Sequence, residues 1–222
     1  MGEVAQNLIR TYCFVTNLSF SEESTVKNRL MPYIKQVIER GFNVILVTSD
    51  SKPVEGFDDR FFTHILNPSQ TKRPCSYIKR ALYEWNEAKK ILKSLIELDV
   101  EAVIITIPSM FLLFRASQLK NKKLFLDVRD LTWEYLPSSK PIQFVAKVFF
   151  RVLANTSFRF FSSIAVTNES EIEYFKQKNM RALLYSNGVT RQQFIDLAAI
   201  TGKTSEEFTI SYVGKVGIAQ LG

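Results

Sequence analysis

The run Asp127 to Trp133, DVRDLTW, places two carboxylates and a guanidinium within four residues. It follows an apolar stretch that has the pattern of a buried strand. Ligands of open α/β sheets bind beyond the carboxyl ends of the strands, so such groups could orient hydroxyls or hold a phosphate. We therefore take Asp127, Arg129 and Asp130 as candidate catalytic residues. The alternative is a structural ion pair at a strand end, with an aspartate capping the next element.

Two glycine-containing segments near the carboxyl terminus could approach a phosphate group. In VGKVG, Gly214, Lys215 and Gly217 follow an apolar run, and glycines there let the backbone come close to an anion. This is not the full dinucleotide fingerprint. The second segment is SNGV, with Asn187 and Gly188, whose simplest interpretation is a turn.

A basic and aromatic stretch spans residues 138–163, and no acidic residue lies between Glu134 and Glu169. As a helix it would be amphipathic, and such a helix can lie in a membrane interface. The candidate membrane-surface residues are Lys147, Phe149, Phe150, Arg151 and Arg159. An ordinary core-facing helix with solvated basic residues remains the alternative. Because the aromatics match no RNA-recognition motif, we expect no nucleic-acid partner.

The amino-acid composition limits which partners and which kinds of active site the chain is expected to have. The net charge of +7 favours an anionic partner, whether nucleic acid, anionic lipid or a phosphorylated substrate. One histidine and two scattered cysteines, Cys13 and Cys75, argue against a metal site and a Ser-His-Asp hydrolase. The amino terminus lacks the pattern of a signal peptide, and no window is apolar enough to predict a spanning helix. We expect reduced thiols and a cytoplasmic protein.

The elements that position these residues alternate between strands and helices. Uniformly apolar runs predict strands near 12–16, 44–47, 62–66, 103–107, 124–128, 164–167, 183–185 and 210–213. Helical spacing predicts helices that end at Gly41, that span about 76–98 and that begin at Glu169. Strands without alternation belong to a parallel sheet that is covered on both faces. The predicted fold is therefore α/β, a doubly wound Rossmann-like parallel sheet.

The polar segment 191–207 predicts a linker between two parts of the chain. We expect a Rossmann-like domain over 1–190, this linker, and the first strand and loop of a second domain over 208–222. A strand and a glycine loop alone are too short for a complete domain. We therefore expect a truncated second domain.

In its order of motifs, the chain resembles the amino-terminal domain of family 4 retaining glycosyltransferases, which have the GT-B fold. The matching pieces are ERGFNVILVTSD (39–50), DVRDLTW (127–133), IAVTNES (164–170), YSNGV (185–189) and ISYVGKVGIAQLG (210–222). Bacterial members that build surface polysaccharides such as lipopolysaccharide are the most similar. The resemblance covers nearly the whole chain.

The resemblance implies transfer of a sugar from a nucleotide-sugar donor to a lipid-linked or oligosaccharide acceptor, without a metal ion or other cofactor. Asp130 would face the cleft, and Gly214 and Gly217 would approach the donor diphosphate. The acceptor-side loop would contain Asn17 and Ser19, in the stretch NLSFSEES. Two departures are that Arg129 stands where many members have histidine, and that this loop has no glycine.

The resemblance also implies that this fragment alone is inactive, because the donor domain would be missing. Two other functions stay open. One is a nucleotide-sugar 2-epimerase, although His64 is the only histidine available for it. The other is a non-catalytic, membrane-associated α/β module, with peripheral association to the inner face of the membrane.

Overall fold

The computed structural model describes residues 10–66, 77–106 and 110–186. The chain divides into two units, Met1–Ser186 and Asn187–Gly222, and all described residues belong to the first. The predicted division at 190, the linker 191–207 and the strand near 210–213 lie outside the described residues and stay predictions.

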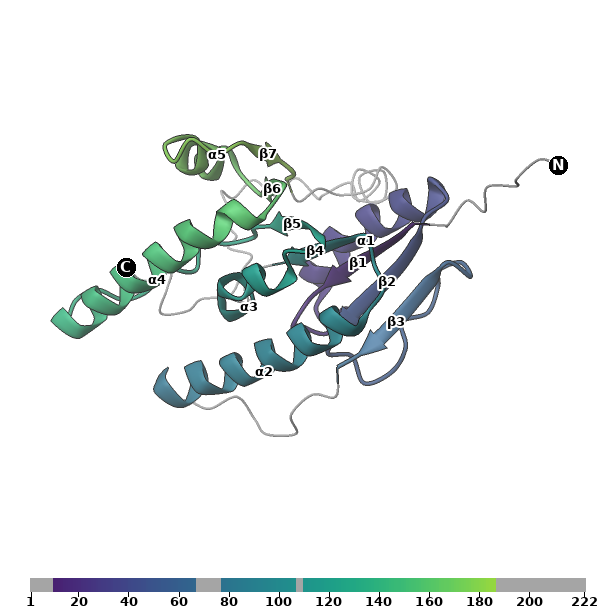
Figure 1. The fold of residues 1–222 in the computed structure, drawn as a ribbon, viewed down its shortest axis with the longest axis horizontal. Helices are drawn as coiled ribbons and strands as arrows, with labels where there is room; N and C mark the ends of the chain where they lie inside the picture. The colour runs from purple at the N-terminus through teal and green to yellow at the C-terminus, as the bar shows by residue number, and fades with distance from the viewer. Residues whose placement is uncertain (1–9, 67–76, 107–109, 187–222) are drawn as a thin grey trace, which may run out of the picture. The chain divides into compact units, whose positions relative to one another are not determined.

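Within the described residues, seven parallel strands form one sheet in the order β3-β2-β1-β4-β5-β6-β7 (Figure 1). The strands are β1 (Thr11–Val15), β2 (Asn43–Thr48), β3 (Phe61–Ile65), β4 (Ala102–Thr106), β5 (Lys123–Asp127), β6 (Ser163–Val166) and β7 (Ala182–Leu184). Strand order reverses between β1 and β4, which are direct neighbours in register from Tyr12 opposite Ala102. This doubly wound parallel sheet confirms the predicted fold class.

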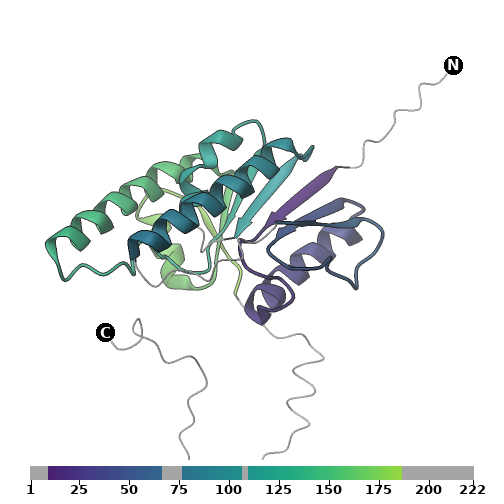
Figure 2. The same cartoon turned by 90° about the horizontal axis from the view of Figure 1, so that it is seen from below.

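The helices between the strands are α1 (Ser24–Glu39), α2 (Tyr77–Glu97), α3 (Met110–Phe114), α4 (Pro141–Ser157) and α5 (Glu169–Lys176). Two short 3₁₀ turns, η1 (Ala116–Leu119) and η2 (Phe158–Phe160), precede β5 and β6. Right-handed crossovers place α1 on one face of the sheet and the later helices on the other. Figure 2 shows α1, in purple, across the strands from α2, α3 and α4.

Successive side chains of the central strands point alternately into two hydrophobic cores, one on each face of the sheet. On β1, Phe14 packs with α1 residues such as Leu30 and Ile34, whereas Cys13 and Val15 pack on the opposite side. That second core is larger and extends to Trp133 and to the other helices. Because both faces of the central strands are buried, these strands are apolar at successive positions.

Short-range backbone and side-chain hydrogen bonds set the end of α1 and the start of α5. Gly41 has φ +86° and ends α1 in a Schellman motif, with its N–H donating to the carbonyl of Ile38 and the Phe42 N–H to that of Val37. Asn168 begins α5 in a capping box: its Oδ1 accepts from the Glu171 N–H at 3.0 Å. The Glu171 carboxylate in turn accepts from the backbone N–H groups of Thr167 and Asn168.

Candidate functional site

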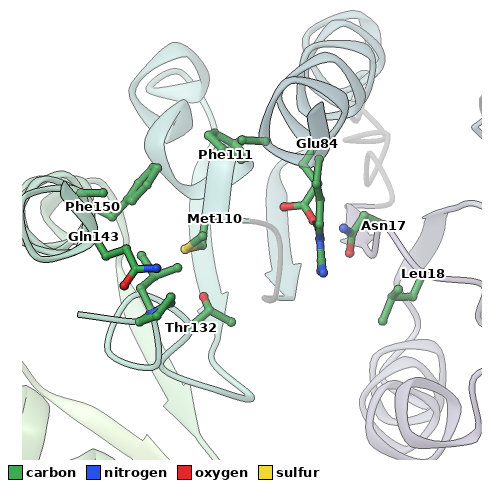
Figure 3. Close-up of a pocket in the computed structure, with 13 residues that line it drawn as sticks. Asn17, Leu18, Glu84, Met110, Phe111, Thr132, Gln143 and Phe150 are labelled. Carbon is green, nitrogen blue, oxygen red and sulfur yellow. Dashed lines mark hydrogen bonds and ion pairs between the residues drawn. The ribbon is translucent and has the colours of Figure 1, made fainter. Parts of the chain in front are cut away.

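A pocket of about 440 Å³ lies beyond the carboxyl ends of β1, β4 and β5 (Figure 3). Asn17 and Leu18 follow β1, Met110 and Phe111 belong to α3, which follows β4, and Thr132 follows β5. The outer walls come from α2 and α4. Their lining residues are Arg80, Ala81 and Glu84 of α2 and Gln143, Ala146 and Phe150 of α4, and Leu136 and Pro137 complete the wall. The pocket therefore lies at the reversal of strand order, where doubly wound sheets bind ligands.

The lining is mostly apolar, with a few converging polar groups. Figure 3 shows Glu84 pointing into the space between Asn17 and Thr132. Asn17 Oδ1 and Thr132 Oγ1 are buried and accept or donate no hydrogen bond among the described residues. Native proteins rarely leave such atoms without a partner. The site is thus a mostly apolar pocket with a few polar residues on its wall, among them Asn17, Glu84, Thr132 and Gln143.

Asp50, which follows β2, holds the loop after β1 in place. Its carboxylate accepts hydrogen bonds from the Ser19 hydroxyl at 2.6 Å, the Phe20 N–H at 2.7 Å and the Ser21 N–H at 2.9 Å. Burial alone would raise the pKa of Asp50. These hydrogen bonds and one from Thr48 outweigh burial and hold the pKa below its ordinary value.

The two residues predicted for the acceptor-side loop therefore have different environments. Asn17 lines the pocket, whereas the Ser19 hydroxyl is engaged with Asp50 inside the loop. Their role toward an acceptor stays a prediction. The sequence analysis missed Asp50, although a carboxylate at the end of a strand next to a glycine-free loop is a signal that could have indicated it.

Asp127 lies in a buried ion pair and not on the pocket wall. Its side chain is 2% exposed and that of Arg29, on α1, is fully buried. Arg29 Nε donates to both Asp127 oxygens at 2.9 Å, and its Nη1 donates to the carbonyl of Tyr185 at 2.6 Å. This geometry corresponds to the structural alternative of the sequence analysis, an ion pair at a strand end. The Asp127 carboxylate is therefore bound by Arg29 and does not line the pocket, and its predicted catalytic role stays a prediction.

Tyr185, which follows β7, also packs against the Arg29–Asp127 pair. Its ring stacks on Tyr33 of α1 with a centroid distance of 4.0 Å, and Arg29 Cζ lies 5.1 Å from the same ring. Burial, followed by the nearby Asp127 charge, raises the pKa of Tyr33. The cluster thus ties α1, β5 and the end of β7 together. Arg29 was missed although it occupies the apolar face of α1 together with Val26 and Leu30.

Arg129 and Asp130 lie along the chain between Asp127 and Thr132, which lines the pocket. Asp130 is exposed, and its carbonyl accepts from the N–H of Thr132, which lines the pocket. Arg129 is half-buried, and its Nη1 has no hydrogen-bond partner among the described residues. The catalytic role of Arg129 and Asp130 stays a prediction.

A hydrogen-bonded network supports the wall formed by the loop after β5. Trp133 Nε1 donates to the Tyr174 hydroxyl at 2.8 Å. The Tyr174 hydroxyl in turn donates to Glu134 Oε1 at 3.0 Å. Arg151 of α4 pairs with the other oxygen of Glu134. Burial raises the pKa of Tyr174, and its bond to Glu134 acts in the same direction. The network joins α4, α5 and the loop. It therefore holds the loop that carries Thr132 against the part of α4 that lines the pocket.

The five residues predicted for a membrane surface do not share one face. Phe149 is 58% exposed and Arg159 is exposed, while Lys147 is half-buried. Phe150 points inward, where it lines the pocket and stacks on Phe114 at 5.7 Å. Arg151 is bound to Glu134. Phe150 is therefore turned toward the pocket, and Arg151, whose side chain is 42% exposed, is paired with Glu134; a membrane-surface role for the five residues stays a prediction.

The residues predicted to bind the donor lie outside the described residues: Asn187, Gly188, Gly214, Lys215 and Gly217. Among the residues that the structure describes, no group of three or more His, Cys, Asp or Glu side chains could hold a metal ion. None of the described helices is both long and apolar enough to span a membrane.

No family model matches the chain, and no curated protein matches it in sequence. Solved structures do match the fold. A sucrose-phosphate synthase from Thermosynechococcus elongatus is similar with a TM-score of 0.56 and 11% identity, over 82% of this chain and 49% of that one.

Two plant transferases give the same result. A UGT transferase from Siraitia grosvenorii, solved with UDP, has a TM-score of 0.50 and 11% identity over 86% of this chain and 54% of that one. A UGT from Glycyrrhiza uralensis, solved with glycyrrhetinic acid 3-O-monoglucuronide, has a TM-score of 0.51 and 10% identity over 81% and 49%. This chain spans about half the length of these structures. Its described part has the Rossmann-like α/β fold found in one half of these glycosyltransferases.

Proposed function

We propose that the chain is the acceptor-side half of a retaining glycosyltransferase of family 4. The enzyme transfers a sugar from a nucleotide-sugar to a lipid-linked or oligosaccharide acceptor in the synthesis of a bacterial surface polysaccharide. The observation that carries the proposal is the pocket at the reversal of strand order, between Asn17 and Thr132. The fold shared with the halves of glycosyltransferases supports it.

The composition of the pocket fits an acceptor better than a nucleotide diphosphate. Its walls are mostly apolar, and Arg80, its one basic lining residue, is paired with Glu84 at 2.9 Å. A diphosphate requires several N–H groups or cations, whereas a hydroxylated and partly apolar molecule needs few polar partners. Asn17 Oδ1 and Thr132 Oγ1 supply such partners. The diphosphate would then bind to the segment with Gly214, Lys215 and Gly217, as the resemblance implies.

In the proposed reaction, the bond between the anomeric carbon and the diphosphate oxygen breaks, and a bond to an acceptor hydroxyl oxygen forms. The hydroxyl proton passes to the departing diphosphate oxygen, and the nucleoside diphosphate is released. Asp130, exposed beside the loop that carries Thr132, is the carboxylate that we assign to the reacting end of the acceptor. Arg129 would balance the negative charge that develops on the leaving diphosphate. We propose no metal ion or other cofactor.

The test uses the polypeptide that contains this chain, with a panel of nucleotide-sugars and with glycosides that carry lipid or oligosaccharide groups. We expect release of nucleoside diphosphate that depends on an acceptor. Thr132→Val should raise the KM for the acceptor while donor hydrolysis is unchanged, because only an acceptor contact is lost. Ser117→Val, at an exposed position of η1, is the matched control.

The proposal fails if no nucleotide-sugar is bound, hydrolysed or transferred across the panel. A second outcome against it is an epimerised nucleotide-sugar that forms without acceptor, which would indicate a 2-epimerase.

A further inference from the structure

Helix α4 presents an apolar strip to solvent. Ile142, Val145, Phe149 and Val152 are exposed by 78%, 66%, 58% and 53%. Their spacing of three, four and three residues places them along one face of the helix. We call these four residues the outer strip. Phe144 and Val148 extend it on one side, also exposed, so the apolar surface is contiguous over most of the helix.

The outer strip is not needed to hold α4 on the molecule. The opposite side of the helix provides the packing: Ala154 and Ser157 are buried, Phe150 stacks on Phe114, and Arg151 pairs with Glu134. No described residue covers the strip. Contiguous exposed apolar surfaces of this kind mark sites of interaction with another protein or a membrane.

The charges around the strip indicate which partner it has. Lys140 and Arg159 are exposed near the two ends of α4, and Lys147 lies along it. Among the described residues, no carboxylate lies within 4.0 Å of any of these three, so their charges are not neutralised locally. The stretch between Glu134 and Glu169 contains no acidic residue. The apolar strip is thus flanked by an exposed basic residue near each end of the helix, whereas Lys147 lies on the side opposite the strip.

We propose that α4 docks on an anionic lipid bilayer, with the outer strip buried at the level of the headgroups and with Lys140 and Arg159, at the two ends of the helix, near the lipid phosphates. An interfacial helix binds through buried apolar area and through attraction of basic residues to anionic lipid, and the strip provides both. The ribbon view in Figure 1 is compatible with this arrangement, since the amino-terminal turns of α4 extend beyond the ends of the strands.

A second copy of the chain and a nucleic acid fit this surface less well. In a two-fold dimer the same surface of each copy would meet, so unpaired basic residues would face basic residues. A nucleic acid is held mainly through its phosphates by many basic groups, whereas the centre of this surface carries none. A bilayer accepts both the apolar strip and the basic residues near the ends of the helix.

The docking would also hold the pocket close to the membrane surface. Unlike the docking itself, the use of that position rests on the proposed function. Gln143, Ala146 and Phe150 line the pocket from the inner side of the same helix, as Figure 3 shows for the two of them that it labels. A helix is about 10 Å across. A lipid-linked acceptor could then enter the pocket from the membrane surface without leaving the bilayer.

The experiment is flotation of the full chain with vesicles of phosphatidylcholine, either alone or with about 30 mol% phosphatidylglycerol to supply the anionic charge. We expect binding to the anionic vesicles that weakens as salt is raised. Phe149→Glu should lower the bound fraction by about tenfold or more, because it removes one large buried side chain and adds a repelled charge. Ile96→Glu is the matched control, since Ile96 is 55% exposed on α2, and its binding should equal that of the parent chain.

Val145→Glu provides a second, independent variant, and circular dichroism reports whether each variant is folded. The proposal is overturned if the parent chain does not float with anionic vesicles, or if Phe149→Glu and Val145→Glu bind as well as Ile96→Glu. It is also overturned if the strip variants dissociate a dimer in light scattering while no vesicle is bound. None of these readouts depends on sugar transfer, so a failed transferase assay leaves this test intact.

Discussion

Replacing one partner of the Arg29–Asp127 pair should destabilise the fold strongly. Both side chains are buried, and Arg29 Nε bonds both carboxylate oxygens at 2.9 Å. Arg29→Met leaves the Asp127 carboxylate buried without its cation, and Asp127→Leu leaves the guanidinium without its anion. Removing one member of such a buried pair costs about 3–5 kcal/mol. Arg29→Met also removes the donor to the Tyr185 carbonyl, which loosens the end of β7.

The assay is urea unfolding followed by far-ultraviolet circular dichroism. With a denaturant slope of about 2–3 kcal/mol per molar urea, each single replacement should lower the midpoint by about 1–2 M. The double variant Arg29→Met/Asp127→Leu removes both charges and refills the volume, and should recover most of this loss.

Two results would refute the reasoning. One is a loss below about 1 kcal/mol for each single replacement, since that is the range of an exposed pair. The other is a double variant that loses the sum of the two singles, because independent sites add and partners do not. If Asp127 acted on a substrate instead, its replacement would abolish activity and leave the urea midpoint nearly unchanged.

Three further outcomes follow from other polar groups. Asp50→Asn should destabilise the chain by about 1.5–3 kcal/mol at neutral pH. Because the folded pKa of Asp50 is lowered, its contribution is full above the unfolded pKa of about 3.9 and is lost as the pH falls through the folded pKa, so urea midpoints of parent and variant should converge in acid. Tyr174→Phe leaves the buried Trp133 N–H without its acceptor and should cost about 1–3 kcal/mol in the same assay. Cys13, fully buried with its pKa raised to about 12, should resist iodoacetamide at mildly alkaline pH in a Cys75→Ser background until urea unfolds the chain.

The centre of the sheet could be predicted from the sequence because β1, β2 and β4 are short and mostly apolar runs. Burial on both faces removes the polar positions that would otherwise interrupt such a run. The ends of α1 and α5 were equally visible, since Gly41 and the segment Thr167–Glu171 are local signals that need no distant partner. Local chemistry therefore determined most element boundaries to within a residue or two.

The inner face of α2 can be predicted only in part from the sequence, because the spacing of large apolar residues would place Leu82, Trp85 and Ile96 on it. Leu82 and Ile96 are 60% and 55% exposed, and Trp85 is 37% exposed. The buried arc is centred near Ala88 and includes Ile91. A helix pattern shows which residues share a face, but the sheet decides which face packs against it. Here the close approach of the helix requires a small residue at the contact, which an argument from large apolar side chains overlooks.

The buried ion pair could not be derived from spacing, because Arg29 and Asp127 are 98 residues apart. The sequence offered the correct alternative, an ion pair at a strand end, but not the partner. Arg29 falls on the apolar face of α1, and a charged residue at such a position indicates a buried partner. Only the three-dimensional arrangement shows that the partner is the first carboxylate of DVRD.

The loop after β1 has few backbone groups left to bind an anion beside the pocket. A loop at this place binds phosphate when its backbone N–H groups are free to point at the ligand. Here the N–H groups of Phe20 and Ser21 are already bonded to the Asp50 carboxylate. The protein thus fills this position with its own anion, and a second negative charge would be repelled. The glycine-free loop is thus fixed internally by Asp50, and what remains open to a ligand is the apolar pocket beside Asn17.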